Sequence, residues 1–203
     1  MARIESLFVT RVYRAELGAP ALDAELLTAC QGISIEDRAG RAWSRANGYR
    51  GYTSYASLTD LPQRASVFDD LSRRITPHVG RFARALELDL DGRRLELDSL
   101  WINVLEAGGH HTAHIHPHSV VSGTYYVDVP QGASAIRFED PRLPHLMAAP
   151  PRKASARRVN QQFVTVDPKA GTLLLWESWL RHEVPVNAAR RPRVSLSFNY
   201  RWS

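Results

Sequence analysis

The spacing of apolar residues along this chain changes near residue 90. Before that point they recur every three to four positions, as on one face of a helix, most clearly from residue 61 to 86. Pro77 interrupts this run, which therefore predicts either one kinked helix or two helices. An earlier helix is expected to begin at Pro20, because proline suits the first helical position, and to run to about Cys30. Residues 1–92 are thus predicted to be mostly helical.

Short apolar runs separated by turn residues follow Asp91-Gly92. They predict strands at about 93–105, 121–129, 134–139, 159–166, 172–177, 182–187 and 193–202. Strands of this length and spacing are typical of a sandwich or barrel, and a jelly roll fits best because its two facing sheets leave a mouth where side chains can meet. We therefore predict a mainly β fold with N-terminal helices. Residues 1–203 would form a single domain whose β core spans 93–203.

Two segments fit neither pattern. Residues 43–55 are rich in glycine and aromatic side chains, too polar for a core and too aromatic for a simple linker, so we expect a loop with a function. The proline-rich, basic stretch 140–158 is expected to be a long connection between strands, and loops of that length are often lids. Both segments are candidates to frame a substrate, although neither specifies its chemical class.

Composition narrows the class of protein. Cys30 is the only cysteine, so no intramolecular disulfide can form and a reduced, cytoplasmic protein is expected. No apolar run has the length of a signal peptide or a membrane span. The net charge of +5 comes almost entirely from scattered arginines, which does not favour nucleic-acid binding but suits an anionic or polar metabolite or a peptide side chain as substrate. The sequence indicates no oligomeric state.

Histidine is unevenly distributed along the chain. Five of the eight histidines lie within residues 110–118, and His182 stands alone after an apolar run. Neutral imidazole is the commonest metal ligand, and residues two apart in an extended segment share a face, so His114 and His116 can bind one ion together. His182 is the candidate third ligand, provided that the fold returns it to this pair. The alternative is a set of solvated or hydrogen-bonded histidines in a wet loop.

Three motifs occur in order around these histidines: Trp101-Ile102-Asn103-Val104, then His114-Ile115-His116-Pro117 with Ser122-Gly123-Thr124-Tyr125-Tyr126-Val127, then His182 with Arg193-Val194-Ser195-Leu196-Ser197-Phe198-Asn199. Together they resemble the 2-oxoglutarate/Fe(II)-dependent oxygenase family, in the branch with H-x-H-P, S-G-x-Y-Y-V and R-x-S-x-S-F-N segments. The resemblance is close over residues 99–142 and 164–200.

The resemblance implies a double-stranded β-helix, which is a jelly-roll variant, holding Fe(II) and 2-oxoglutarate. It assigns the metal to His114, His116 and His182. Arg193 matches the basic residue that grips the distal carboxylate of 2-oxoglutarate, which a planar guanidinium does with two parallel hydrogen bonds. The implied reaction decarboxylates 2-oxoglutarate to succinate and usually hydroxylates a substrate carbon.

Three further residues are candidates for contact with the cosubstrate. Ser195 lies two residues after Arg193, on the same strand face, and is expected to donate to the same carboxylate. Asn103 and Tyr125 lie on the strands before and after the ligand segment, so both are expected to border the site. Core packing is the alternative for each of these two residues.

One feature departs from the commonest pattern of such oxygenases. Non-haem Fe(II) oxygenases usually bind iron through two histidines and one carboxylate, whereas position 116 is histidine here. Three neutral ligands leave more positive charge on the metal. Asp128, Asp140 or Glu183 would restore a carboxylate if the fold brought one of them close, although Glu183 should face away from its neighbour His182 in an extended segment.

Two other functions compete with the oxygenase. A cupin-type three-histidine dioxygenase or isomerase would act without 2-oxoglutarate, and the spacing from Gly108 to His114 and His116 resembles the opening of a cupin motif. However, the glutamate expected next is absent, since positions 120 and 121 are both valine. A non-catalytic metal- or sugar-binding module is the third reading, and it would leave Arg193 without a role.

Overall fold

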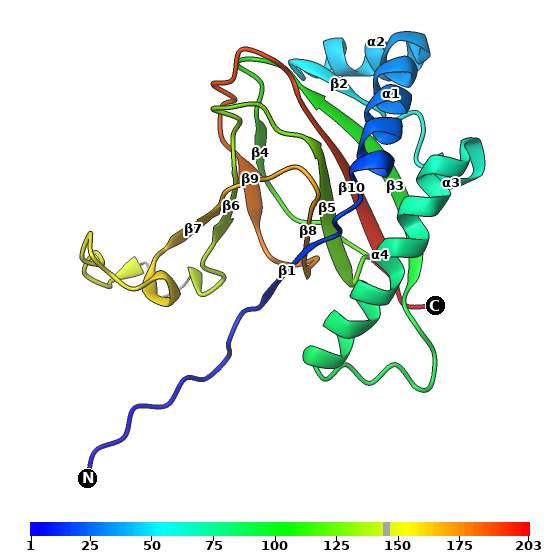
Figure 1. Ribbon diagram of the computed structural model, residues 1–203. Coiled ribbons are helices and arrows are strands. Elements are labelled where there is room, and N and C mark those ends of the chain that lie inside the picture. Colours follow the sequence, from blue (N-terminus) through cyan, green and yellow to red (C-terminus); the bar gives the residue numbers. More distant parts are fainter. Residues whose placement is uncertain (144–146) are drawn as a thin grey trace.

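The computed structural model describes residues 1–143 and 147–203, and within them ten strands form two antiparallel sheets that face each other (Figure 1). The larger sheet contains, in spatial order, β1 (Val12–Glu16), β8 (Thr172–Glu177), β5 (Val121–Asp128), β10 (Arg193–Arg201), β3 (Glu96–Leu105) and β2 (Gly51–Thr53). The smaller sheet contains β4 (His111–His114), β9 (His182–Val184), β6 (Ile136–Glu139) and β7 (Phe163–Val166). This arrangement confirms the predicted jelly roll with N-terminal helices.

The helices cover one face of the larger sheet (Figure 1). They are α1 (Pro20–Glu36), α2 (Arg38–Ala46), α3 (Leu61–Arg64) and α4 (Ser66–Ala85), and a short 3-10 turn, η2 (Arg158–Asn160), precedes β7. The main hydrophobic core lies between α1, α4 and this outer sheet face, and a smaller apolar cluster lies between the two sheets. None of the helices formed by the described residues is long and apolar enough to span a bilayer.

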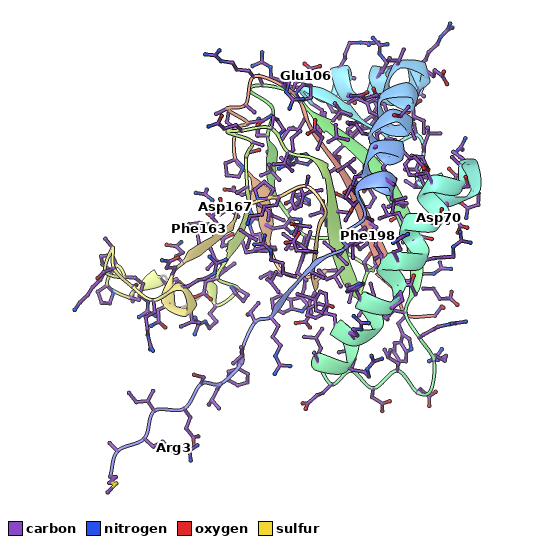
Figure 2. The ribbon with its side chains drawn as sticks, viewed as in Figure 1. Arg3, Asp70, Glu106, Phe163, Asp167 and Phe198 are labelled. Atoms are coloured by element: carbon purple, nitrogen blue, oxygen red, sulfur yellow. The ribbon has the colours of Figure 1, made fainter. Side chains whose placement is uncertain are left out.

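Strand β10 shows how the sequence assigns the two faces of the larger sheet. Its outward side chains are apolar or aromatic and pack among the helices: Val194, Leu196, Phe198 (labelled in Figure 2) and Tyr200. Its inward side chains are polar and face the space between the sheets: Arg193, Ser195 and Ser197. Because successive strand residues point to opposite faces, the R-x-S-x-S-F-N segment supplies one apolar and one polar surface.

A glycine on the neighbouring strand is needed for this packing. A side chain at Gly123 of β5 would begin 2.7 Å from the carbonyl oxygen of Leu174 and would collide with the ring of Phe198. The glycine of the S-G-x-Y-Y-V segment therefore lets three central strands lie close together under the helices.

Several predicted elements differ from the structure. Strands β1 and β2 come from the N-terminal region that was expected to be mostly helical, and each completes an edge of the larger sheet. The run at 61–86 contains a break at Ala65, while α4 continues through Pro77. Helix α1 extends past Cys30 to Glu36.

The segment 43–55 is also not a simple loop, and that interpretation was wrong. Its first residues end helix α2, whose N-cap Asp37 accepts a hydrogen bond from the backbone N–H of Gly40 at 3.0 Å. Its later residues form β2, which pairs with β3. Of the predicted long connection 140–158, residues 144–146 lie outside the described residues.

Candidate metal centre

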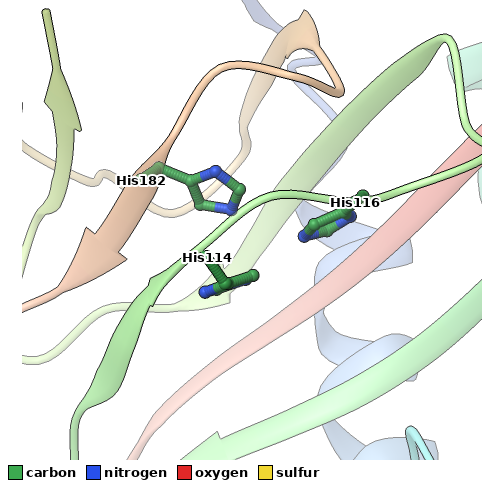
Figure 3. Close-up of side chains that lie close together, drawn as sticks. All are labelled: His114, His116 and His182. Atoms are coloured by element: carbon green, nitrogen blue, oxygen red, sulfur yellow. The ribbon is translucent and has the colours of Figure 1, made fainter. Parts of the chain in front are cut away.

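Three imidazoles converge between the sheets (Figure 3). His114 at the end of β4 lies directly opposite His182 at the start of β9 in the antiparallel pairing. His116 follows two residues after His114, where its backbone N–H donates to the carbonyl oxygen of Ser178 at 3.0 Å. One potential ligand atom from each of the three histidines lies within 4.8 Å of the other two. The fold thus brings together the pair and the distant histidine that the sequence singled out.

Hydrogen bonds orient each of the three rings. The Nδ1 atom of His114 lies 2.6 Å from the carbonyl oxygen of Thr112, and that of His182 lies 2.9 Å from the carbonyl oxygen of Leu180. Since a carbonyl oxygen can only accept, both Nδ1 atoms carry the proton. The Nε2 lone pairs are therefore free to bind a metal, and this arrangement around ligating histidines is typical of metal sites.

The ring of His116 is oriented by side chains rather than by the backbone. Its Nδ1 lies 2.6 Å from Oδ1 of Asn199 and 3.1 Å from Oγ of Ser122, and the Ser122 hydroxyl also donates to Asn199 Oδ1 at 2.8 Å. Asn199 is the last residue of the R-x-S-x-S-F-N segment. Its inward position on β10 follows from the strand alternation, but sequence analysis did not identify it as part of the site.

The protein environment favours the neutral form of His116 and His182. Burial, followed by the nearby His114, lowers the pKa of His182 to about 3. Burial also lowers the pKa of His116, against the opposing effect of the hydrogen bond to Asn199. Because a metal binds the unprotonated ring, this electrostatic environment favours metal binding at neutral pH.

No carboxylate of the described residues lines the cavity around the three histidines. The acidic residues considered as extra ligands are paired with arginines instead: Asp128 with Arg191, Asp140 with Arg142 and Glu183 with Arg137. The expected outward direction of Glu183 agrees with this pairing. The centre in the described part of the chain is therefore built from three neutral ligands.

The cavity next to the histidines is lined by side chains from both sheets: Trp101, Asn103, His111, Thr124, Tyr126, Ile136, Trp176, Val184, Arg193, Ser195 and Ser197. Arg193 is only 3% exposed and lies 5.5 Å from the ring centre of Tyr126. Its Nη1 donates to the carbonyl oxygen of Ser134 at 2.6 Å, and no acidic residue among those described forms an ion pair with it. A buried guanidinium without a counter-charge is costly, so this cavity suits an anionic ligand.

Buried polar atoms without hydrogen-bond partners lie at or beside the cavity that contains Arg193. Among the described residues, three such side-chain atoms are found: Nε of Arg193, Nε1 of Trp176 and Oγ of Ser134. The first two belong to residues that line the cavity, and the third belongs to the residue whose carbonyl oxygen Arg193 contacts. Because buried donors are nearly always hydrogen-bonded, unpaired donors here indicate a position for a ligand with acceptor oxygens.

The remaining predicted contacts divide between the two faces of the larger sheet. Asn103 and Ser195 line the cavity, although both polar ends of Asn103 already bond Thr53 and Ser197. Tyr125 does not line it. Its side chain points to the helices, where its hydroxyl donates to Asp23, and this corrects the expectation that it borders the site.

Tyr126 and His111 line the cavity but were not among the predicted cosubstrate contacts. Tyr126 takes the place expected for Tyr125, because the strand alternation turns the next residue inward. His111 also faces the cavity, with Nε2 3.0 Å from the hydroxyl of Tyr49, whereas His110 and His118 are exposed. Burial, followed by the nearby charge of Arg193, lowers the pKa of His111 to about 3.

Comparison with known proteins identifies the family. The model of the family described as "Putative 2OG-Fe(II) oxygenase" matches residues 99–199, which include every strand that carries a candidate ligand. The chain belongs to this oxygenase family. No curated protein matches the sequence.

Solved structures resemble this oxygenase over almost its whole length. The epimerase SnoN from nogalamycin biosynthesis aligns over 95% of this chain and 78% of its own, with 18% identity and a TM-score of 0.67. A prolyl-4-hydroxylase from Pseudomonas putida aligns over 95% and 93%, with 17% identity and a TM-score of 0.59. HygX from Streptomyces hygroscopicus aligns over 94% and 81%, with 12% identity and a TM-score of 0.60. At these identities the likeness shows the fold, which is the double-stranded β-helix.

Family membership also confirms the predicted cofactors. A 2OG-Fe(II) oxygenase uses Fe(II) and 2-oxoglutarate, and the cavity contains groups suited to both: a cluster of three imidazoles and a buried arginine without an acidic partner among the described residues. The chain is thus a 2OG-Fe(II) oxygenase with a three-histidine site.

Proposed function

We propose that this oxygenase is a hydroxylase of a small molecule or a peptide side chain, with iron held by His114, His116 and His182. The observation that carries the proposal is the meeting of these histidines with buried Arg193 in one cavity. The Nδ1 atom of each histidine is hydrogen-bonded, which leaves each Nε2 available for a metal, and Nε of Arg193 has no partner among the described residues. A cytoplasmic location, expected from the single buried cysteine, is part of the proposal.

Bound Fe(II) and 2-oxoglutarate would supply the oxidising chemistry, which consumes O₂ and releases succinate and carbon dioxide. The chain's own residues would bind the iron and orient 2-oxoglutarate beside it. Arg193 would hold the distal carboxylate of 2-oxoglutarate through Nε and its second terminal nitrogen, since Nη1 is engaged with Ser134. Ser195, which follows on the same face of β10, would donate its hydroxyl to the same carboxylate.

The three neutral ligands have an electrostatic consequence. In a site with two histidines and a carboxylate, the protein cancels one unit of the metal's charge, whereas this cavity offers no carboxylate among its described residues. Dianionic 2-oxoglutarate would therefore be attracted both by Arg193 and by a metal that retains its full charge. A cupin without 2-oxoglutarate would leave Arg193 buried without a counter-charge, so the geometry favours the oxygenase.

Hydroxylation is one of several outcomes compatible with this fold. The similar structures include an epimerase and a prolyl hydroxylase in complex with a peptide fragment. A net addition of one oxygen atom to the substrate, detected as a mass increase, would support hydroxylation. A product of unchanged mass would contradict it and indicate epimerisation.

The test uses purified protein supplied with Fe(II), ascorbate, 2-oxoglutarate and air, with succinate as the product measured. We expect slow succinate formation without substrate, abolished in His182→Ala. The matched control is His110→Ala, which removes an exposed imidazole near the centre and should leave succinate formation unchanged. Succinate formation that persists in His182→Ala, or that never occurs in a protein shown to bind Fe(II), would refute the proposal.

A further inference from the structure

A row of aromatic side chains runs from the metal centre to the molecular surface. The ring of Trp101 lies 5.9 Å from that of His116, Tyr55 lies 5.4 Å from Trp101, and Trp43 lies 6.3 Å from Tyr55, all measured between ring centres. Trp101 is 6% exposed, Tyr55 55% and Trp43 36%. We call Trp43, Tyr55 and Trp101 the aromatic row.

The N-terminal region supplies the outer members of this row. Trp43 lies on α2, and Tyr55 follows β2, which extends the larger sheet beside β3. Ser54 fixes this junction, because its backbone N–H donates to the carbonyl oxygen of Ile102 and its hydroxyl oxygen accepts from the backbone N–H of Ile102, both at 3.0 Å. Tyr55 is thus held next to Trp101 by backbone pairing and not by a mobile loop.

The contacts within the row leave aromatic surface available. Both the Trp43–Tyr55 and the Tyr55–Trp101 pairs meet edge to face, at 61° and 68° between ring planes. In this geometry two rings do not cover each other's faces as stacked rings do. Tyr55 and Trp43 are large, partly exposed rings that continue outward from Trp101, which lines the cavity. They are therefore a surface for apolar contact with a ligand.

The charge of the cavity restricts the ligand that this surface accepts. Aromatic faces attract cations as well as other rings. However, Arg193 lies in the cavity, no described carboxylate lines it, and the proposed iron would add further positive charge. A cationic group that approached the cavity along the row would be repelled, whereas a neutral or anionic ring would not.

We propose that the aromatic row is the substrate-binding wall of this oxygenase, and that the substrate carries a neutral or anionic aromatic ring. The inference rests on the proposed function, because it takes the three histidines as the place of reaction. The ring would lie against Tyr55 and Trp43, and an attached carbon would extend past Trp101 toward the metal. This narrows the polar metabolite or peptide side chain suggested by composition to one with an aromatic group.

The experiment compares two small probes of similar size, 4-fluorobenzamide and 4-fluorocyclohexanecarboxamide, by fluorine NMR titration. The protein is loaded with 2-oxoglutarate and either Zn(II) or Fe(II) under anaerobic conditions, so that no turnover occurs. We expect 4-fluorobenzamide to bind several-fold more tightly than the saturated amide. We also expect its signal to broaden more on the Fe(II) protein, because the probe lies near the paramagnetic ion.

Substitutions in the aromatic row test whether 4-fluorobenzamide binds there. Tyr55→Ala and Trp43→Ala should each weaken 4-fluorobenzamide binding roughly three- to tenfold, since aromatic pairs contribute beyond their buried area. Tyr55→Phe should retain it. The matched control is Trp202→Ala, which removes a tryptophan that is 48% exposed and contacts Arg93 away from the centre. Thermal melts of all variants would confirm that each is folded.

Each contrary result would overturn the inference. These results are equal binding of the two amides, no saturable binding of either, tighter binding of the cation 4-fluorobenzylammonium, or equal effects of Tyr55→Ala and Trp202→Ala. Failure of the proposed function would look different. In that case ring binding to the Zn(II) protein would persist, while succinate formation would be absent.

Discussion

Replacing Arg193 tests the central electrostatic argument. Its guanidinium is almost fully buried, its Nη1 contacts the carbonyl oxygen of Ser134, and its Nε has no partner among the described residues. The edge formed by Nε and Nη2 is the edge with which Arg64 holds Asp60, at 2.6 and 3.1 Å. We therefore expect Arg193 to hold the distal carboxylate of 2-oxoglutarate through these two nitrogens.

The expected loss of affinity for 2-oxoglutarate follows from the two hydrogen bonds that Arg193→Met removes. A hydrogen bond to a charged group contributes about 1.5–3 kcal/mol, so losing two should weaken 2-oxoglutarate binding by at least about 100-fold. Arg193→Lys keeps the charge but loses the planar pair of donors, and it should fall between the wild type and Arg193→Met.

The stability of the ligand-free protein should not fall together with its affinity for 2-oxoglutarate. Without ligand, Arg193 is a buried charge with no counter-charge among the described residues, so Arg193→Met is expected not to lower the melting temperature. Saturating 2-oxoglutarate should stabilise the metal-loaded wild type by about 2.7 kcal/mol at 100 times its dissociation constant, and this gain should disappear in Arg193→Met. Calorimetric titration and thermal melts, with and without 2-oxoglutarate, measure both effects.

The control is Arg191→Met, which removes an exposed arginine two residues away that pairs with Asp128 at 3.4 Å. This variant should bind 2-oxoglutarate like the wild type. If Arg193→Met binds the cosubstrate within about twofold of the wild type, or if Arg191→Met weakens binding equally, the assignment of this cavity to the distal carboxylate is refuted.

Three further predictions follow from the contacts. Asn199→Ala removes the acceptor for the Nδ1 proton of His116 and should weaken metal binding about 10- to 100-fold, measured by chelator competition; unchanged affinity would show that the ring needs no such partner. Because the pKa of His111 is lowered to about 3 in the folded state, the unfolded chain takes up its proton first. The contribution of His111 to stability should therefore fall from about pH 6.5 toward pH 3, by about 1–2 kcal/mol between pH 7 and 5. Denaturant titrations should show a smaller fall in His111→Gln, and an identical fall would contradict this. Gly80→Ala should raise the unfolding free energy by about 0.5–1 kcal/mol, because its Cβ would meet only a side-chain nitrogen of Arg84 at 3.7 Å; a lower melting temperature would disprove it.

The local pattern of the chain is sufficient to predict the strands that form the site. The inward row Arg193, Ser195 and Ser197 and the outward row of β10 follow from a period of two, which is a property of any extended segment. The same reasoning, applied one residue further along β5, would have preferred Tyr126 to Tyr125. That error arose because both tyrosines suit a strand, and only the packing of helices on one face decides which side is the core.

What the sequence by itself determined is the chemistry available: an H-x-H pair, a distant histidine and an arginine at strand positions. Tertiary structure alone decided that β4 pairs with β9, which places His182 opposite His114, and that the acidic residues near the site pair with arginines outside the cavity. It also decided that β2 joins β3 and places Tyr55 against Trp101, which lines the cavity of the metal centre. Pairing between strands distant in sequence depends on the free energy of the whole folded chain, because no local pattern specifies which strand will be the neighbour.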